Sequence, residues 1–191
     1  MVIGSHNSWS YLRPQKWWAR VFRFVARCQR VDIRQQYVKY GVRCFDLRVR
    51  LDEHGVLVVA HGLVAYQYEY RQLLEDLAWI DGKRDCYVRV IHEIRKKRKL
   101  TDEQTAFFKR FCQDLQETYR NIQFWCGRNL ATWTVDYIFG DEPTCEERYS
   151  SVSKPRLIDD WWPWLYAWWH NDAIRLASTE KDILLMDFVD V

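Results

Sequence analysis

Residues 41–62 read GVRCFDLRVRLDEHGVLVVAHG, and this stretch decides the fold. Along Val42–Leu51 apolar side chains alternate with polar ones, which is typical of a strand with one face against a core. A second apolar stretch, Val56–Ala60, begins after four turn residues at Asp52–Gly55. A parallel crossover needs about a dozen or more residues, so this short connection predicts an antiparallel β-hairpin.

The hairpin also predicts which side chains meet. A turn of two residues at His54-Gly55, or of four at Asp52–Gly55, pairs even positions of the first strand with odd positions of the second. His61 then lies opposite Arg48 or Asp46, on the polar face of the first strand. Two interpretations stay open here. One is a site where an acid, a guanidinium and an imidazole converge; the other is a solvated hairpin face with a cross-strand ion pair.

The rest of the chain alternates between strand and helix patterns. Asp32 is expected to cap a short helix that ends at Gly41, and Thr101 with Gln104 forms a capping box. Such alternation favours an α/β fold with a largely parallel sheet or barrel. Helices are expected at residues 14–28, 32–41, 66–80, 101–119 and 161–176, and further strands at 2–3, 86–94, 121–126 and 183–189, with only a short strand or turn within 130–156.

Length and composition limit the class of protein. The chain has 191 residues, of which 48% are hydrophobic and 16% aromatic. This predicts a single domain over residues 1–191 and excludes collagen-like and disordered chains. A TIM-type barrel typically takes about 250 residues. A (β/α) barrel in this chain would therefore be compact and irregular, with shortened helices and one β-hairpin connection.

Charge and cysteine content narrow the partners and the compartment. The formal net charge of +3 suits an anionic ligand but is far below that of a dedicated nucleic-acid binder, so nucleic acid is not an expected partner. The six cysteines form no CxxC pair, which favours free thiols in a reducing compartment. No transmembrane segment and no signal peptide is visible. We expect a cytoplasmic protein, or a secreted or periplasmic one if a signal peptide has been removed.

His6 adds a second imidazole, in the segment Gly4-Ser5-His6-Asn7-Ser8 that follows the first strand. Two histidines and one arginine are the minimal set for metal-free cleavage of a phosphodiester. One imidazole takes the proton of the attacking hydroxyl and the other protonates the leaving oxygen, while the guanidinium clamps the phosphate oxygens. His6, His61 and Arg48 therefore indicate phosphodiester chemistry by acid–base catalysis.

Four motifs together resemble the X region of phosphatidylinositol-specific phospholipases C. They follow the family's order and spacing over residues 2–63 and are Gly4-Ser5-His6-Asn7-Ser8, Gln35-Gln36, Gly41-Val42-Arg43-Cys44-Phe45-Asp46-Leu47-Arg48 and Ala60-His61-Gly62. Ile91-His92-Glu93 and Leu185–Val189 add a weaker similarity, the second to bacterial members. The resemblance implies an irregular TIM barrel that cleaves a phospholipid or similar phosphodiester through a cyclic inositol phosphate, with peripheral contact with a membrane.

Carried over residue by residue, the resemblance implies a role for each side chain. His6 would be the general base, His61 the general acid, and Arg48 the group that stabilises the pentacoordinate phosphorane. Asp46 would hold His61 or the phosphate-binding network, and Asp187 would orient His6. The expected substrate-binding residues are Asn7, Glu93 and Arg128.

Asn7 departs from the bacterial pattern, which has Asp after the first His. The calcium-dependent eukaryotic members have Asn there, as a metal ligand. They also place a second carboxylate where this chain has Arg48, whose positive charge replaces that of the ion and repels it. We therefore expect no metal and no cofactor; if calcium were bound, its ligands would be Asn7, Asp46 and Glu93.

Two further stretches have two interpretations each. Trp161–Trp169 holds five tryptophans in nine residues. It is either a lipid-interface belt or sugar-stacking platform, or, as we favour, a helix buried on several sides through Trp162, Leu165, Trp169 and Ala173. The cations Arg95–Lys99 attract anionic head groups or form a solvated loop. The alternative to an enzyme is a non-catalytic module on the same fold that binds anionic lipid or phosphosugar.

Overall fold

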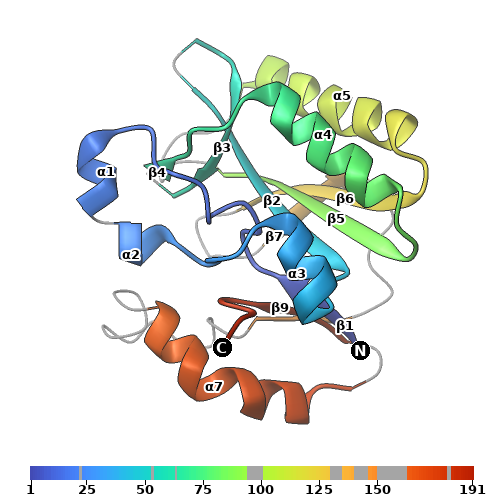
Figure 1. The fold of residues 1–191 in the computed structure, drawn as a ribbon. Coiled ribbons are helices and arrows are strands. Elements are labelled where there is room, and N and C mark those ends of the chain that lie inside the picture. The colour runs from blue at the N-terminus through green and yellow to red at the C-terminus, as the bar shows by residue number, and fades with distance from the viewer. Residues whose placement is uncertain are drawn as a thin grey trace.

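The centre of the fold is a curved sheet of mostly parallel strands (Figure 1). In the described part of the chain the strand order is β7-β6-β5-β2-β1-β9-β8, and all neighbours are parallel except β6 and β7. The computed structural model describes residues 1–21, 23–52, 54–62, 64–93, 101–129, 135–139, 146–149, 163–179 and 182–191. The strands are β1 (Val2–Ser5), β2 (Cys44–Leu51), β5 (Cys86–His92), β6 (Ile122–Asn129), β7 (Val135–Phe139), β8 (Glu146–Tyr149) and β9 (Asp182–Met186).

Helices cover the outer side of this sheet (Figure 1). α4 (Tyr70–Asp81) and α5 (Asp102–Thr118) lie together on one side of the molecule, and α7 (Pro163–Ala177) lies on the other, against β9. Between β1 and β2 the chain forms α1 (Trp17–Val21), α2 (Arg23–Ala26) and α3 (Ile33–Tyr40), so the helix expected over residues 14–28 is divided in two. No helix among the described residues is both long and apolar enough to cross a bilayer.

The sheet curves far enough for distant strands to meet on its concave face. Trp125 on β6 shares a buried apolar cluster with Ile183 and Leu185 on β9, although β5, β2 and β1 lie between these strands. Within the described residues no pairing joins β7 to β8. The predicted α/β class is therefore confirmed, and closure into a barrel stays a prediction. The expected single hairpin connection is an undercount, because β2 and β3, β3 and β4, and β6 and β7 each pair antiparallel within the described residues.

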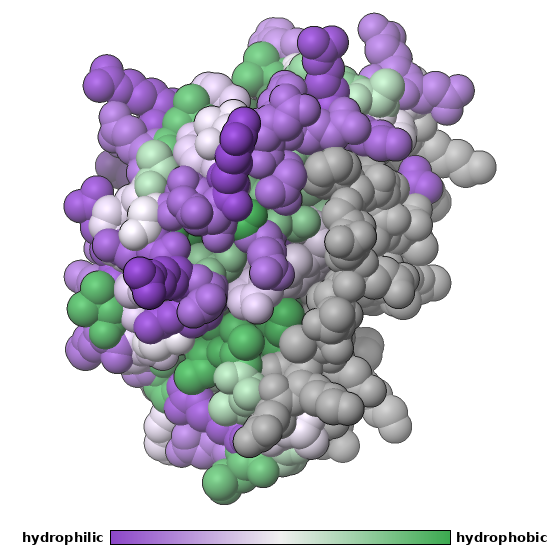
Figure 2. Space-filling view, turned by 90° about the vertical axis from the view of Figure 1, so that its right-hand side faces the viewer, coloured by the Kyte–Doolittle hydropathy of each residue, from purple (hydrophilic) through white to green (hydrophobic). Residues whose placement is uncertain are grey.

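Along β2 the concave face of the sheet changes from apolar residues to charged residues. Cys44 of β2 belongs to the apolar cluster near the amino-terminal ends of the strands, whereas Asp46 and Arg48 follow on the same face toward the carboxyl-terminal ends. Figure 2 shows the outside of the amino-terminal end, where the described surface is mostly hydrophilic and apolar residues gather in the lower half. Asp46 and Arg48 lie toward the opposite end of the sheet, where the parallel strands end and the loops to the next helices begin.

The predictions for the helix ends are confirmed. The Asp32 side chain accepts a hydrogen bond from the Gln35 amide at 2.9 Å, and Gly41 has a left-handed φ of 69° at the end of α3. Thr101 and Gln104 form the reciprocal capping box of α5. These signals are local to a few residues, which explains why the sequence alone was sufficient for them.

The predicted β-hairpin forms, but its register is shifted by one residue. β2 pairs with the antiparallel strand β3 (Leu57–His61) so that Leu51 is opposite Leu57, which leaves a loop of five residues, 52–56, instead of two or four. The cause is Asp52, whose Oδ1 accepts hydrogen bonds from the amides of His54 at 2.8 Å and Val56 at 2.9 Å. The Asp52 amide also donates to the Val56 carbonyl at 2.9 Å, so these bonds together fix the turn between Asp52 and Val56 and with it the register.

The shift changes the position expected for His61. Pairing between β2 and β3 ends at Val59, after which β3 pairs with β4 (Val64–Ala65) and His61 is opposite Val64. The expectation that His61 lies opposite Arg48 or Asp46 in the hairpin is therefore wrong. His61 nevertheless lies near the predicted site, because its ring is 5.7 Å from that of His6 and the charge of Arg48 acts on it.

The tryptophan-rich segment is helical where it is described, but a different face is buried. Pro163, Ala167 and Asn171 are the buried residues of α7, whereas Trp169 is 59% exposed. The small Ala167 permits close approach, and the Asn171 side chain donates to the Asp187 carbonyl at 3.0 Å. The expected burial through Trp169 and Ala173 is therefore wrong.

Several predictions fall outside the described residues. Trp161, Trp162 and the basic run Arg95–Lys99 belong to this group, as does Cys145. Within 130–156 the structure describes only β7 and β8. The other five cysteines are free thiols, as expected: Cys28, Cys44, Cys86, Cys112 and Cys126.

Candidate active site

The candidate site is organised around Asp46, a fully buried carboxylate in the middle of β2. Arg48 Nε donates to Asp46 Oδ2 at 2.8 Å, and Arg89 Nη1 donates to Oδ1 at 3.2 Å. Burial alone would raise the pKa of the Asp46 carboxyl, but the two guanidinium groups outweigh burial and hold that pKa well below its usual range. Asp46 is therefore a fixed negative charge at neutral pH.

Arg89 is a site residue that sequence reasoning missed. It lies on β5 directly opposite Asp46 in the parallel register, and no part of it is exposed. A signal was present, because an arginine inside an otherwise apolar strand needs an anionic partner. Choosing Asp46 as that partner required the strand order and the register.

The turn after β1 closes over Asp46. The Asn7 amide donates to Asp46 Oδ2 at 2.9 Å, and the Asp46 amide donates to Ser8 Oγ at 2.8 Å. Asn7 has a left-handed φ of 45°, a conformation that asparagine adopts more readily than most residues. Neither side-chain amide atom of the buried Asn7 has a hydrogen-bond partner in the part of the chain that the structure describes.

His6 is oriented by Asp187, the residue that follows β9. His6 Nδ1 lies 2.7 Å from Asp187 Oδ1, so Nδ1 carries the ring proton and donates it to the carboxylate. His6 Nε2 then presents a lone pair and lies 3.8 Å from Asp46 Oδ2. His6 is thus arranged as a proton acceptor whose charged form two carboxylates stabilise.

Gln29 holds the two loops that carry His6 and Asp187. Its Nε2 donates to the carbonyls of His6 at 3.1 Å and Met186 at 2.7 Å, and its Oε1 accepts from the Val189 amide at 3.2 Å. Sequence reasoning missed Gln29 because no spacing rule links a loop glutamine to the ends of two strands.

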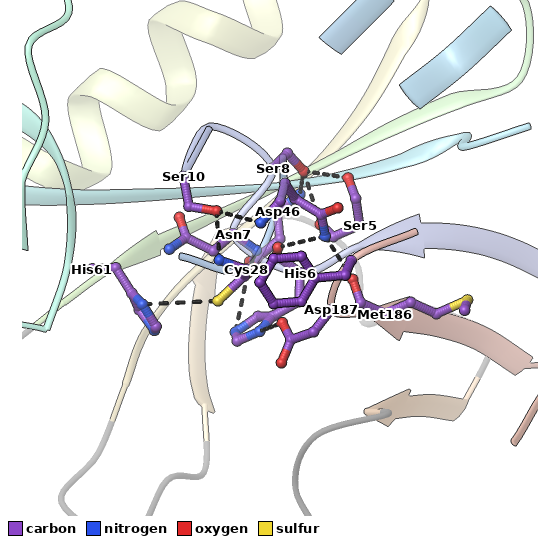
Figure 3. A network of polar contacts seen from close by, with 12 residues as sticks. Ser5, His6, Asn7, Ser8, Ser10, Cys28, Asp46, His61, Met186 and Asp187 are labelled. Carbon is purple, nitrogen blue, oxygen red and sulfur yellow. Dashed lines mark hydrogen bonds and ion pairs between the residues drawn. The ribbon is translucent and has the colours of Figure 1, made fainter. Parts of the chain in front are cut away.

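His61 faces His6 across the site (Figure 3). The two ring centroids are 5.7 Å apart and the rings are nearly perpendicular, at 89°. His61 Nδ1 lies 3.0 Å from the Ala26 carbonyl oxygen, so Nδ1 donates there. Burial lowers the pKa of His61; Glu93 opposes this change, whereas His6 and Arg48 add to it.

Arg48 lies between two carboxylates. Besides Asp46, it donates through Nη1 to Glu93 Oε1 at 3.2 Å, and the other Glu93 oxygen accepts from the Gly62 amide. Glu93 therefore ties the end of β5 to the end of β3. Calcium does not fit this arrangement, because the guanidinium occupies the space between Asp46 and Glu93, the two carboxylates that would have to share the ion.

Arg128 is the one expected site residue that the structure does not bring into the group. It is in register with His92, whose ring packs against Phe108 of α5 at 5.1 Å between centroids. Arg128 therefore lies on the helix-covered face of β6, away from the concave face. The residues that do come together are His6, Asn7, Asp46, Arg48, His61, Glu93 and Asp187.

Among the known proteins compared with this chain, only solved structures match it. No family model and no curated protein sequence matches the chain, but solved structures do. A variant of the phosphatidylinositol-specific phospholipase C from Staphylococcus aureus matches over 98% of this chain and 84% of its own, with a TM-score of 0.62 and 16% identity. The phosphatidylinositol-specific phospholipase C from Listeria monocytogenes matches over 98% and 87%, with a TM-score of 0.62 and 14% identity. The chain has the fold of the bacterial phosphatidylinositol-specific phospholipases C.

At this identity the likeness establishes the phospholipase C fold alone, and the site must be judged on its own residues. It agrees with the resemblance carried by the motifs of residues 2–63, which a comparison of whole sequences does not detect.

The contribution of the Asp46 carboxylate to stability can be tested by removing its charge. Asp46→Asn removes the buried negative charge that Arg48 and Arg89 share, although Arg48 keeps Glu93, and should lower the free energy of unfolding by about 3–5 kcal/mol at neutral pH. Because the folded pKa of Asp46 lies below the unfolded value, the deficit should be complete above about pH 4 and should shrink as the pH falls further.

Urea unfolding of both proteins measures this deficit. The control is Asp172→Asn, which removes an exposed partner of Arg175 and should change the free energy by less than about 1 kcal/mol. Equal losses in the two variants would contradict the central role of Asp46.

Proposed function

We propose that this protein is a phosphodiesterase of the phospholipase C type. It cleaves an inositol-containing or similar hydroxylated phosphodiester by metal-independent acid–base catalysis, and the first product is a cyclic phosphate. The observation that carries the proposal is the pair of imidazoles, 5.7 Å apart, of which one is tied to a carboxylate, with Arg48 fixed beside them.

The two histidines fit opposite halves of one proton transfer. His6 Nε2 takes the proton of a substrate hydroxyl next to the phosphate, and the hydroxyl oxygen then attacks phosphorus. As the bond from phosphorus to the leaving oxygen breaks, His61 donates its proton to that oxygen. Arg48 stabilises the negative charge that develops on the phosphoryl oxygens.

The surroundings of the two rings favour this division of roles. His6 lies near Asp187 and Asp46, which stabilise the imidazolium that forms when it accepts a proton. His61 Nδ1 donates to a backbone carbonyl rather than to a carboxylate, and burial favours the neutral form of the ring. His61 therefore gives up its proton readily, as a general acid must.

Turnover of phosphatidylinositol, followed by phosphorus NMR, tests the proposal. A cyclic phosphate should appear, and His6→Ala or His61→Ala should each lower kcat by about 10²–10⁴-fold. His54→Ala, in the exposed hairpin loop, is the matched control and should turn over normally. Activity that survives loss of both site histidines would reject the mechanism.

The non-catalytic alternative predicts another pattern. A module that binds anionic lipid would give no cyclic phosphate, and its salt-sensitive binding to liposomes would survive His6→Ala and His61→Ala. This result would replace the proposed function.

The lowered pKa of His61 gives the reaction a specific pH dependence. A general acid works only while protonated, so kcat/KM for a soluble substrate should fall as the pH rises through the pKa of His61, which lies below the usual value of about 6.5. The descending limb of the pH–rate profile should therefore be centred below about pH 6.5. A descending limb clearly above that value would exclude His61 as the acid.

Peripheral contact with a membrane completes the proposed function. Trp17 is 75% exposed on α1 and Trp168 is 58% exposed on α7, and α7 contacts α2. α2 ends at Ala26, whose carbonyl accepts the hydrogen bond from His61, so this aromatic surface adjoins the site. The S. aureus phospholipase C binds membranes. Amphipathic indole rings are favoured at the interface between lipid and water.

Sedimentation with phosphatidylinositol vesicles tests this contact. Trp17→Ala and Trp168→Ala should each weaken binding by on the order of 10-fold, since each withdraws a large apolar side chain from the interface. Val38→Ala, which trims a 75% exposed apolar residue on α3, is the control and should bind normally. Equal binding by all variants would reject this surface.

A further inference from the structure

A thiol lies inside the candidate site, between the two imidazoles. In Figure 3 the sulfur of Cys28 lies between the rings of His6 and His61. Cys28 Sγ is 3.9 Å from His61 Nδ1, and Cys28 is only 2% exposed. The Cys28 thiol has no role in the mechanism proposed above.

Cys28 belongs to a group of potential metal ligands. One donor atom each from His6, Cys28 and Asp187 lies within 4.8 Å of the others, and all three residues are buried. No other group of three or more such residues was found in the portion of the chain that the structure describes. His61 lies at the edge of the group, but its nitrogen nearest the sulfur, Nδ1, donates to the Ala26 carbonyl and is not counted as a ligand.

The backbone around Cys28 holds the sulfur in place. Ser10 Oγ accepts hydrogen bonds from the amides of Cys28 at 2.9 Å and Gln29 at 2.8 Å, and the Cys28 carbonyl accepts from the Phe188 amide. The thiol is thus fixed to the segment after β1 and to the segment after β9. These two segments carry His6 and Asp187.

We infer that His6, Cys28 and Asp187, with His61 beside them, form a binding site for a thiophilic divalent cation such as Zn²⁺. Thiolate, imidazole and carboxylate are the ligands that Zn²⁺ takes in proteins, at about 2.0–2.3 Å. Tetrahedral ligands at such lengths are roughly 3.5 Å apart, so small side-chain rotations bring the donors into range. A hard ion such as Ca²⁺ would not use the sulfur.

The charges around the thiol favour a cation over a bare thiolate. The Asp187 carboxylate belongs to the group, so its negative charge lies within 4.8 Å of the sulfur. A divalent ion is attracted by the same carboxylate. On binding, the S–H bond breaks, a sulfur–zinc bond forms and the proton leaves to solvent, with no change of oxidation state.

Occupancy of this site would remove His6 from catalysis. On the proposed function, Zn²⁺ would therefore inhibit the phosphodiesterase, and a chelator would restore it. The binding itself does not depend on that function, because it is measured without substrate.

Titration of the chelator-treated protein with Co²⁺ tests the site, since a thiolate–cobalt bond gives a charge-transfer band in the near ultraviolet. Wild-type protein should show the band, and Zn²⁺ should remove it. Cys28→Ser should lose the band and bind Zn²⁺ more weakly, by more than the roughly 10–100-fold typical of losing a residue that only orients a ligand. Cys86→Ser, which removes a buried thiol on β5, is the matched control and should keep the band.

X-ray absorption of the zinc-loaded wild-type protein provides a test that needs no variant. One sulfur should appear at about 2.3 Å from zinc, among lighter ligands. No band in the wild-type protein, a band that survives Cys28→Ser, or a zinc shell without sulfur would each overturn the inference. If the protein turns over phosphatidylinositol, Zn²⁺ that binds without inhibiting would overturn the overlap with His6. Binding without any turnover would instead reject the proposed function and leave the metal site standing.

Discussion

The structure depends on one buried negative charge, the carboxylate of Asp46. An ionised carboxylate inside a protein is stable only when opposite charges and hydrogen bonds replace the water that it loses. Here Arg89 meets it from within the sheet, Arg48 from the site and the Asn7 amide from the turn after β1. Three segments that are distant in sequence are therefore held by the same group. The catalytic geometry proposed above follows from how that charge is neutralised.

The site treats its two histidines unequally. His6 is hydrogen-bonded to a carboxylate, whereas His61 is hydrogen-bonded to the carbonyl of Ala26 and lies near Arg48. Side chains with the same intrinsic chemistry are thereby placed in different surroundings, which is a general way to assign acid and base roles.

The sequence predicted much of the site, but it did not identify some of the residues that hold the site in place. His6, Asp46, Arg48 and His61 could be predicted because they stand in short motifs. The hairpin register could not, since one Asx turn at Asp52 adds a residue to the loop. The partners of Asp46 and His6 that come from other strands or loops, Arg89 and Gln29, depend on register and on loop paths that no local pattern encodes. The same limit explains the wrong placement of Arg128 in the site, because its pairing with β5 decides which face of the sheet it occupies. It also explains the wrong buried face of α7, which is set by the hydrogen bonds of Asn171 rather than by the tryptophans.

Gly4 allows β1 to pack closely between its two neighbouring strands. A Cβ at this position would lie 2.6 Å from Leu185 Cδ2 and 3.1 Å from the Cβ of Cys44, so β1 is pressed between its two neighbours. A strand clamped in this way cannot bend without displacing both of them, and His6 directly follows it. His61 is carried by the hairpin at the margin of the sheet and is followed by Gly62, whose φ is 55°. The proposed general base therefore stands directly after a strand that is fixed from both sides, whereas the proposed general acid stands in a hairpin and is followed by a glycine of positive φ.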